Sequence, residues 1–212
     1  MLEGLDLLVG LLDALFGLVA LLARVESILL QGFERGVVLF LDGLPQGFAL
    51  ALPFPCDRLL LLIEYRMPPK HPFPAAVEDV VAVWKSLLKK RDAKSMALGG
   101  TSAGGGLVLA STHKLIGLGI PVPGALFAGT PLISPVYGDF KGVPSTYLVS
   151  GTRDMFLSNT VRTHRKLRTA DLVADLNVYE GFSHGEYLKV IDSPESQQVF
   201  AELGAFLLKY LK

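Results

Sequence analysis

The pattern of apolar and polar residues predicts strands that alternate with helices along most of the chain. Short apolar runs bounded by glycine, proline or polar residues are typical of strands, and they occur at residues 28–30, 37–41, 59–63, 96–98, 125–128, 146–149 and 176–179. Apolar residues with helical spacing occupy residues 76–88, 103–116, 159–170 and the segment from Pro194, which Ser193 precedes as a predicted N-cap. The five consecutive apolar residues 59–63 are typical of a parallel strand covered on both faces. This order predicts an α/β fold, with a mostly parallel twisted sheet and helices on both faces.

The first 24 residues have the pattern of an amphipathic helix with a wide apolar face. Polar or small residues recur along one narrow stripe of it, at Glu3, Asp6, Gly10, Asp13 and Gly17. The acidic start disfavours a signal peptide, and the acid at position 13 disfavours a membrane span. We expect residues 1–24 to pack on the protein's own core. A helix shared with a second subunit, or one lying on a membrane surface, is the less favoured alternative.

Composition narrows the class of protein. The length of 212 residues predicts a single domain over residues 1–212, and the 50% share of apolar residues excludes a disordered chain. Because 20 basic residues balance 20 acidic ones, no overall field attracts nucleic acid, and nucleic-acid binding is disfavoured. The single cysteine, Cys56, cannot form an intrachain disulfide, which favours a reducing cytoplasm as the location.

Ser102 is the candidate nucleophile. It is the serine of a G-x-S-x-G sequence, residues 100–104, which lies directly after a predicted strand and directly before a predicted helix. Small residues are needed there because the turn from strand to helix is tight, and the helix N-terminus favours an oxyanion. Gly104, Gly105 and Gly106 could instead cradle a phosphate, but neither G-K-[ST] nor G-x-G-x-x-G is present. The context therefore favours a nucleophilic serine.

His184 is the candidate base, because a serine hydroxyl needs one and this histidine lies in a loop directly after a predicted strand. Of the other three histidines, His71 lies in a proline-rich segment, and His113 and His164 lie within predicted helices, where packing or surface roles are expected. Asp154, which follows the strand 146–149, is the expected orienting acid. Its competitors are the loop carboxylates Asp139 and Glu180.

The order Ser102, Asp154, His184 is that of α/β-hydrolases and differs from the order in the two large serine protease families. The sequence GTSAGG around Ser102, the segments YRMPPKHPFPAA (65–76) and GTRD (151–154), and the loop GFSH (181–184) resemble bacterial esterases of the hormone-sensitive lipase family. The resemblance runs from about residue 63 to 188. It implies an α/β-hydrolase fold, hydrolysis of carboxylic esters through an acyl-enzyme, no cofactor and no metal, and the same three catalytic residues.

The chain departs from that family at the predicted oxyanion loop. Members carry His-Gly-Gly-Gly, whose backbone N–H groups form most of the oxyanion hole, whereas this chain has Asp42, Gly43, Leu44 and Pro45 in the corresponding stretch. Proline has no N–H to donate. We expect Leu44 and Ala103 to be the donors, with Gly43 in the same loop, and Gly47 is the alternative donor if the loop adopts another register. We expect weak activity because one lost donor costs about 10²–10³ in rate.

The second departure is a short connection before residues 132–135, which predicts that the cap over the site is largely missing. An open site predicts a serine carboxylesterase acting on small acyl or aryl esters, lactones included. The alternative is a degenerate hydrolase fold kept as a binding or oligomerisation module. The apolar composition predicts a homo-oligomer, with the first helix, or the last helix and the neighbouring edge strand, at the contact.

Overall fold

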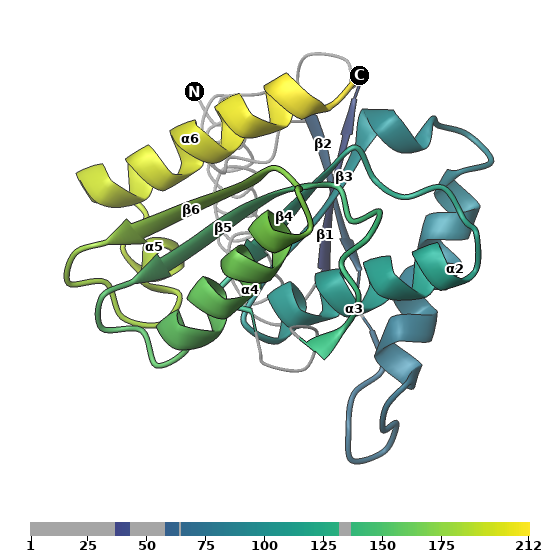
Figure 1. Cartoon of the computed structure of the whole chain (residues 1–212), viewed down its shortest axis with the longest axis horizontal. Helices are drawn as coiled ribbons and strands as arrows, with labels where there is room; N and C mark the ends of the chain where they lie inside the picture. Colours follow the sequence, from purple (N-terminus) through teal and green to yellow (C-terminus); the bar gives the residue numbers. More distant parts are fainter. Residues whose placement is uncertain (1–36, 43–57, 64, 132–136) are drawn as a thin grey trace, which may run out of the picture.

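The computed structural model describes residues 37–42, 58–63, 65–131 and 137–212. Within this part of the chain, six strands form one sheet in the order β2-β1-β3-β4-β5-β6 (Figure 1). The strands are β1 (Val37–Asp42), β2 (Arg58–Ile63), β3 (Met96–Thr101), β4 (Ala125–Gly129), β5 (Ser145–Gly151) and β6 (Ala174–Tyr179). The predicted strand 28–30, the predicted helix 1–24 and Cys56 lie outside the described residues.

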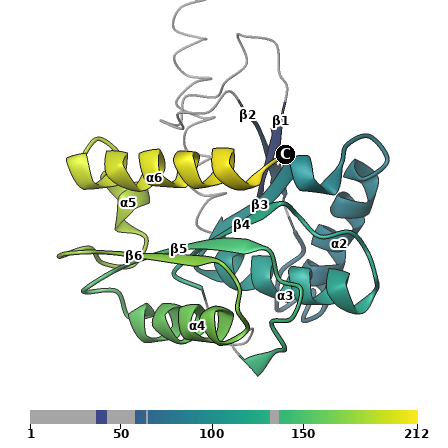
Figure 2. The same ribbon diagram turned by 45° about the horizontal axis from the view of Figure 1, so that its top comes forward.

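Helices cover both faces of this sheet (Figure 2). One face carries α2 (Ala75–Leu87), α3 (Ala103–Gly117) and α4 (Leu157–Thr169), and the other carries the short α5 (Glu186–Lys189) and the long α6 (Pro194–Tyr210). A single 3₁₀ turn, Ala93–Ser95, precedes β3. The predicted start of the last helix is confirmed, because the Ser193 side chain accepts a hydrogen bond from the backbone N–H of Ser196 and Pro194 is the first helical residue.

The parallel part of the sheet has two buried faces, as the apolar runs predict. The strands β3, β4, β5 and β6 pair in parallel. Alternate residues of β3 and β4 enter separate apolar clusters: Leu98 and Leu126 pack with α2, α3 and α4, and Ala97 and Phe127 pack with α5 and α6. This two-sided core confirms the predicted α/β class.

The prediction of a parallel strand at 59–63 is wrong. β2 pairs antiparallel with β1, which is itself antiparallel to β3. An apolar run reports burial and not direction, and a parallel pair needs a crossover of a dozen or more residues, usually helical, whereas an antiparallel pair does not. In the observed register Val37 lies beside Gly100 and Leu41 beside Met96, so β1 ends at the edge of the sheet away from Ser102.

The opposite edge of the sheet collects the residues that carry chemistry. Ser102 directly follows β3, Asp154 follows β5 by three residues and His184 follows β6 by five. Because the carboxyl ends of parallel strands meet at one edge, the three loops lie together there. The connection from β4 to β5 is only residues 130–144, and its described part holds no α-helix, which agrees with the predicted reduced cap.

Candidate active site

Ser102 lies on a strained turn between β3 and α3. Its φ angle is 57°, which a residue with a side chain seldom adopts, and its backbone N–H donates to the Gly129 carbonyl at 2.8 Å. The glycines of the motif are needed for space, because a Cβ on Gly100 would lie 2.6 Å from the carbonyl carbon of Gly104. A Cβ on Gly105 would lie 2.7 Å from the Gly129 oxygen. The predicted tight turn is therefore present.

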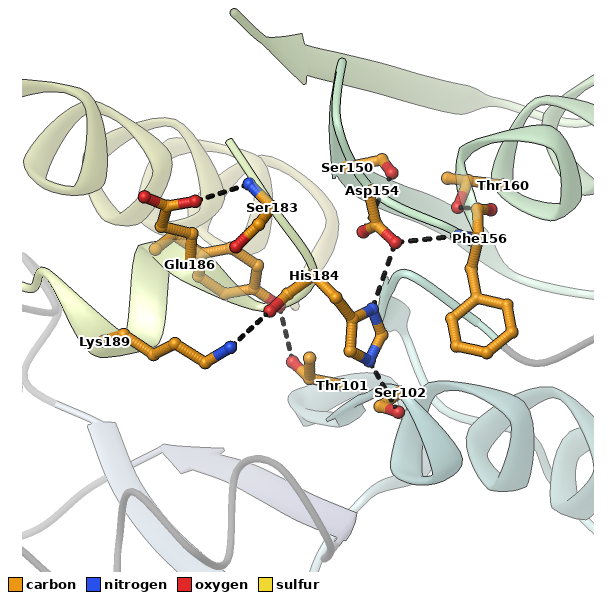
Figure 3. A network of polar contacts seen from close by, with 11 residues as sticks. Thr101, Ser102, Ser150, Asp154, Phe156, Thr160, Ser183, His184, Glu186 and Lys189 are labelled. Carbon is orange, nitrogen blue, oxygen red and sulfur yellow. Dashed lines mark hydrogen bonds and ion pairs between the residues drawn. The ribbon is translucent and has the colours of Figure 1, made fainter. Parts of the chain in front are cut away.

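His184 and Asp154 complete a chain of hydrogen bonds that starts at the serine (Figure 3). His184 Nε2 lies 2.9 Å from Ser102 Oγ, and Nδ1 lies 3.1 Å from Asp154 Oδ1. In the tautomer that can activate the serine, Nδ1–H donates to the carboxylate and Nε2 accepts from the hydroxyl. The predicted base is thus within hydrogen-bond distance of both the predicted serine and the predicted acid.

The Asp154 carboxylate is fully buried and held on both oxygens. Oδ1 also accepts the Phe156 backbone N–H at 2.8 Å, and Oδ2 accepts the Ser150 hydroxyl at 3.2 Å. The Phe156 ring packs edge-on against the His184 ring at 5.0 Å between centroids. These contacts fix the orientation of the carboxylate and of the imidazole. The sequence gives no sign of them beyond the nearness of Ser150 and Phe156 to Asp154.

Hydrogen bonds between nearby residues hold the loop that carries His184. The Glu186 carboxylate accepts the Ser183 backbone N–H at 2.5 Å, and this hydrogen bond holds the pKa of Glu186 below its usual range. Lys189 Nζ donates to the His184 carbonyl at 2.8 Å. Gly185 takes a left-handed φ of 64°, which glycine adopts without strain.

A buried hydrogen bond joins the serine turn to the histidine loop. Thr101 Oγ1 and Tyr187 Oη lie 2.5 Å apart, and both residues are almost completely buried. Thr101 precedes Ser102, and Tyr187 comes three residues after His184. The two residues are 86 positions apart in the sequence and are brought into contact by the fold. Sequence analysis missed it, since no local signal connects a threonine of the motif to a tyrosine of a distant loop.

The competing candidates lie elsewhere. Asp139 is exposed and accepts the Lys141 backbone N–H, and Glu180 is exposed. His113 packs edge-on against Phe140, and His164 Nε2 lies 3.2 Å from the Ala174 carbonyl, so both have the packing roles expected of them. Among the described residues no group of three or more His, Cys, Asp or Glu could hold a metal ion.

Of the predicted oxyanion donors, the structure describes Ala103 alone. Ala103 is the first residue of α3, and the N–H groups of a first turn have no partner within their helix. Gly43 and Leu44 lie outside the described residues, so their role stays a prediction. β1 ends at Asp42, at the edge of the sheet away from Ser102.

Comparison with known proteins identifies the class to which this fold and site belong. A family model described as the alpha/beta hydrolase fold matches residues 47–129 and 118–188, which together are more than half of the chain. The chain belongs to this family. An acetyl-hydrolase of Streptomyces hygroscopicus is 26% identical over 211 residues, covering 78% of this chain and 71% of that protein. An esterase of Acinetobacter venetianus is 21% identical over 188 residues, covering 68% and 62%.

Solved structures agree with this assignment. The crystal structure of esterase E25 matches with a TM-score of 0.70 and 42% identity, over 73% of this chain and 61% of that chain. An esterase of the bacterial hormone-sensitive lipase family matches with a TM-score of 0.70 and 30% identity, over 73% and 66%. The chain thus spans less than two thirds of these esterases. The resemblance to the hormone-sensitive lipase family is confirmed, and the relatives support a carboxylic ester hydrolase.

In the described part of the chain, every helix is too short or too polar to cross a bilayer.

Proposed function

We propose that this protein is a serine carboxylesterase that hydrolyses esters through an acyl-enzyme on Ser102. The observation that carries the proposal is the hydrogen-bond chain from Ser102 through His184 to the buried Asp154. Membership of the α/β-hydrolase family, and the esterases among its relatives, support the same chemistry.

In the first half of the reaction, Ser102 Oγ attacks the ester carbonyl carbon while His184 Nε2 takes the hydroxyl proton. Asp154 stabilises the imidazolium through Nδ1–H. The bond to the leaving alcohol then breaks, and the alcohol oxygen takes the proton from Nε2. The products of this half are free alcohol and an acyl group bonded to Ser102.

In the second half, water attacks the acyl carbon and His184 Nε2 takes one of its protons. The bond between the carbon and Ser102 Oγ breaks, and Oγ recovers the proton from Nε2. The carboxylic acid leaves and the enzyme returns to its starting state.

The negative charge on the former carbonyl oxygen needs preorganised donors. Ala103 N–H, at the start of α3, is the proposed first donor, and the positive end of the helix dipole supports the same charge. Leu44, with Gly43 beside it, is the predicted source of the second. Since one missing donor costs about 10²–10³ in kcat, a chain with Pro45 in place of a family glycine is expected to be a slow enzyme.

The test is hydrolysis of p-nitrophenyl acetate by the wild type and by Ser102→Ala, His184→Ala and the double variant. Each single substitution should lower kcat by several orders of magnitude, and the double variant should be hardly slower than either, because the two residues act as a unit. An organophosphate should add its mass to the peptide that contains Ser102.

Ser86→Ala, an exposed serine of α2, is the matched control and should retain full activity and labelling. Additive losses in the double variant, or labelling at another serine, would contradict the proposal. A wild type no faster than Ser102→Ala would support the alternative, a hydrolase fold kept for binding.

A further inference from the structure

Helix α4 carries several exposed cations and no carboxylate. Its buried residues, Thr160, Thr163 and Leu167, are spaced by three and four positions, so they form one face, which packs on the sheet. The basic residues other than the half-buried His164 all lie off this face and are exposed: Arg162, Arg165, Lys166 and Arg168. We call these four residues the α4 basic face.

The charges of the α4 basic face have no ion-pair partner among the described residues. Asp175 of the neighbouring strand β6 faces α6, because the alternate residues Ala174 and Leu176 pack in the apolar cluster on the α4 side. Asp171, in the turn after α4, is a single exposed acid against four cations. Charges that are not neutralised within the protein favour an anionic partner.

A hollow opens on the same side of α4. Its volume is about 320 Å³, and it is lined by His164, Arg165, Arg168 and Thr169. The His164 ring and the Thr169 hydroxyl already hydrogen-bond to backbone carbonyl groups, at 3.2 and 2.9 Å. The guanidinium groups of Arg165 and Arg168 are therefore the donors left for a ligand. A guanidinium fork matches two oxygens of a phosphate group, so the hollow suits a ligand that carries phosphate.

Exposed apolar side chains accompany the cations. Tyr137 is 71% exposed, and the Arg162 guanidinium lies over its ring, 5.6 Å from the centroid. Val178 lies on the α4 side of β6, by alternation with Leu176, and is 41% exposed. Apolar groups leave water at a lipid bilayer but not at a nucleic-acid backbone, and tyrosine beside basic residues is typical of bilayer surfaces. The combination favours anionic phospholipid as the partner.

The rest of the chain has the opposite net charge. Because the chain has 20 basic and 20 acidic residues, the four cations of α4 leave the other residues with four more acids than bases. Helix α6, which lies on the opposite face of the sheet (Figure 2), carries Glu195 and Glu202 against Lys209. Charges are screened over about 8 Å at physiological ionic strength, and one helix is about 10 Å across. An anionic surface that touches α4 is therefore screened from the acids of α6.

We propose that the α4 basic face docks the protein on an anionic phospholipid bilayer, with a lipid phosphate group in the hollow. Helix α4 begins three residues after Asp154, so this docking places the catalytic edge of the sheet beside the bilayer. Apolar esters collect in such a bilayer because their hydrocarbon leaves water there. The docking goes beyond the proposed function, and it requires no catalysis.

The experiment is sedimentation of the full chain with two kinds of vesicle. One kind holds phosphatidylglycerol and phosphatidylcholine in equal parts, and the other holds phosphatidylcholine alone. Each cation near an anionic surface contributes about fivefold to binding, so the protein should bind the anionic vesicles at least about a hundredfold more tightly than the neutral ones. The difference should shrink as the salt concentration rises, because salt screens the attraction.

The charge-removing variant is Arg165→Gln with Arg168→Gln. It should lower binding to the anionic vesicles about twentyfold, from the loss of two cations. Glutamine is nearly as good a helix former as arginine and both positions are exposed, so Tm should stay close to that of the wild type. Lys209→Gln with Lys212→Gln removes the same charge from α6 and the exposed C-terminus, and is the matched control that should leave vesicle binding unchanged.

Several outcomes would overturn the docking. They are equal binding of the wild type to both kinds of vesicle, an equal loss in the two paired variants, and displacement from the vesicles by inorganic phosphate at constant ionic strength. Binding to a DNA duplex in place of the vesicles would overturn it as well. Ser102→Ala should bind the anionic vesicles as the wild type does, so loss of esterase activity and loss of docking are measured separately.

Discussion

At the scale of single residues, the site depends on contacts that hold the serine and the histidine at a fixed separation. The hydrogen bond of 2.9 Å between them joins two loops that follow strands β3 and β6, which are not neighbours in the sheet. The buried hydrogen bond between Thr101 and Tyr187 joins the same two segments of the chain. We infer that Tyr187 is a positioning residue, which acts through the geometry of Ser102 and His184.

Tyr187→Phe should lower kcat by about tenfold to a hundredfold with little change in KM, because misplacing a reacting group by about 1 Å costs rate and not ground-state binding. The variant also leaves the buried Thr101 hydroxyl without this partner, which costs about 1–3 kcal/mol of stability. Steady-state kinetics and chemical denaturation measure the two effects separately.

The double variant Thr101→Val with Tyr187→Phe distinguishes positioning from stability. Removing both polar partners should recover most of the lost stability, because no hydroxyl is then left unpaired. The rate should stay low if the hydrogen bond positions the serine. Recovery of kcat together with stability would show that Tyr187 has a structural role alone.

The Glu186 carboxylate gives the histidine loop a defined dependence on pH. Its pKa is lowered in the fold mainly by the Ser183 backbone N–H, so the ionised form is favoured by folding. The resulting stabilisation is complete above the pKa of an unfolded glutamate, about 4.3, and is lost as the pH falls through the lower value of the fold. The difference in Tm between wild type and Glu186→Gln should therefore be largest near pH 7 and shrink toward pH 3.

Differential scanning fluorimetry between pH 3 and 8 measures this dependence. Glu180→Gln, which removes an exposed carboxylate from the same stretch of chain, is the matched control and should give a Tm difference that varies little with pH. A Tm difference for Glu186→Gln that grows toward low pH would contradict the assigned role.

At the scale of elements, the packing of α3 against the end of β3 fixes the serine turn. A glycine in β3 makes this close approach possible, whereas the glycine at the end of α3 has no such role. A Cβ at Gly100 would meet the backbone of Gly104, whereas a Cβ at Gly117, the last residue of α3, meets nothing within 4 Å. Glycine is thus required at position 100 and dispensable at position 117.

Gly100→Ala should destabilise the protein by about 2 kcal/mol or more and lower the reactivity of Ser102, because backbone atoms cannot yield as the end of a side chain does. Gly117→Ala should stabilise the protein by about 0.5–1 kcal/mol by reducing the freedom of the unfolded chain. Denaturant unfolding and organophosphate labelling measure both. Equal effects of the two substitutions would contradict this account of the turn.

At the scale of the whole molecule, the described sheet ends at β6, which leaves a strand edge next to α6. Val178 of β6 and Leu208 of α6 are 41% and 55% exposed. An unpaired strand edge with apolar neighbours is a template for association. Self-association therefore stays a prediction for this surface, as it does for the predicted helix at residues 1–24, which lie outside the described residues.

Size-exclusion chromatography with light scattering at micromolar concentration should give a homodimer or a larger oligomer. Val178→Lys should shift the protein toward monomer if the β6 edge is the contact, because a charge at an edge strand opposes pairing. Thr169→Lys, at the end of α4, is a control that should not change the oligomeric state. A wild-type monomer would contradict the prediction.

The sequence by itself determined the features that local signals encode. Burial on both faces requires continuous apolar runs, so the strands β3, β4 and β5 and their class could be predicted from the chain. A nucleophilic serine on a tight turn needs small neighbours, so Ser102 stood out. Asp154 and His184 could be predicted because each lies in a loop that follows a strand, and parallel strands bring such loops to one edge of the sheet.

Only the tertiary structure decided what depends on distant contacts. The direction of β1 could not be predicted, because an apolar strand is equally apolar in both directions and pairing is a long-range choice. The hydrogen bond between Thr101 and Tyr187 joins two segments that no local pattern relates. Neighbouring residues determine backbone conformation and burial, whereas the pairing of strands and the cavities depend on how whole elements pack.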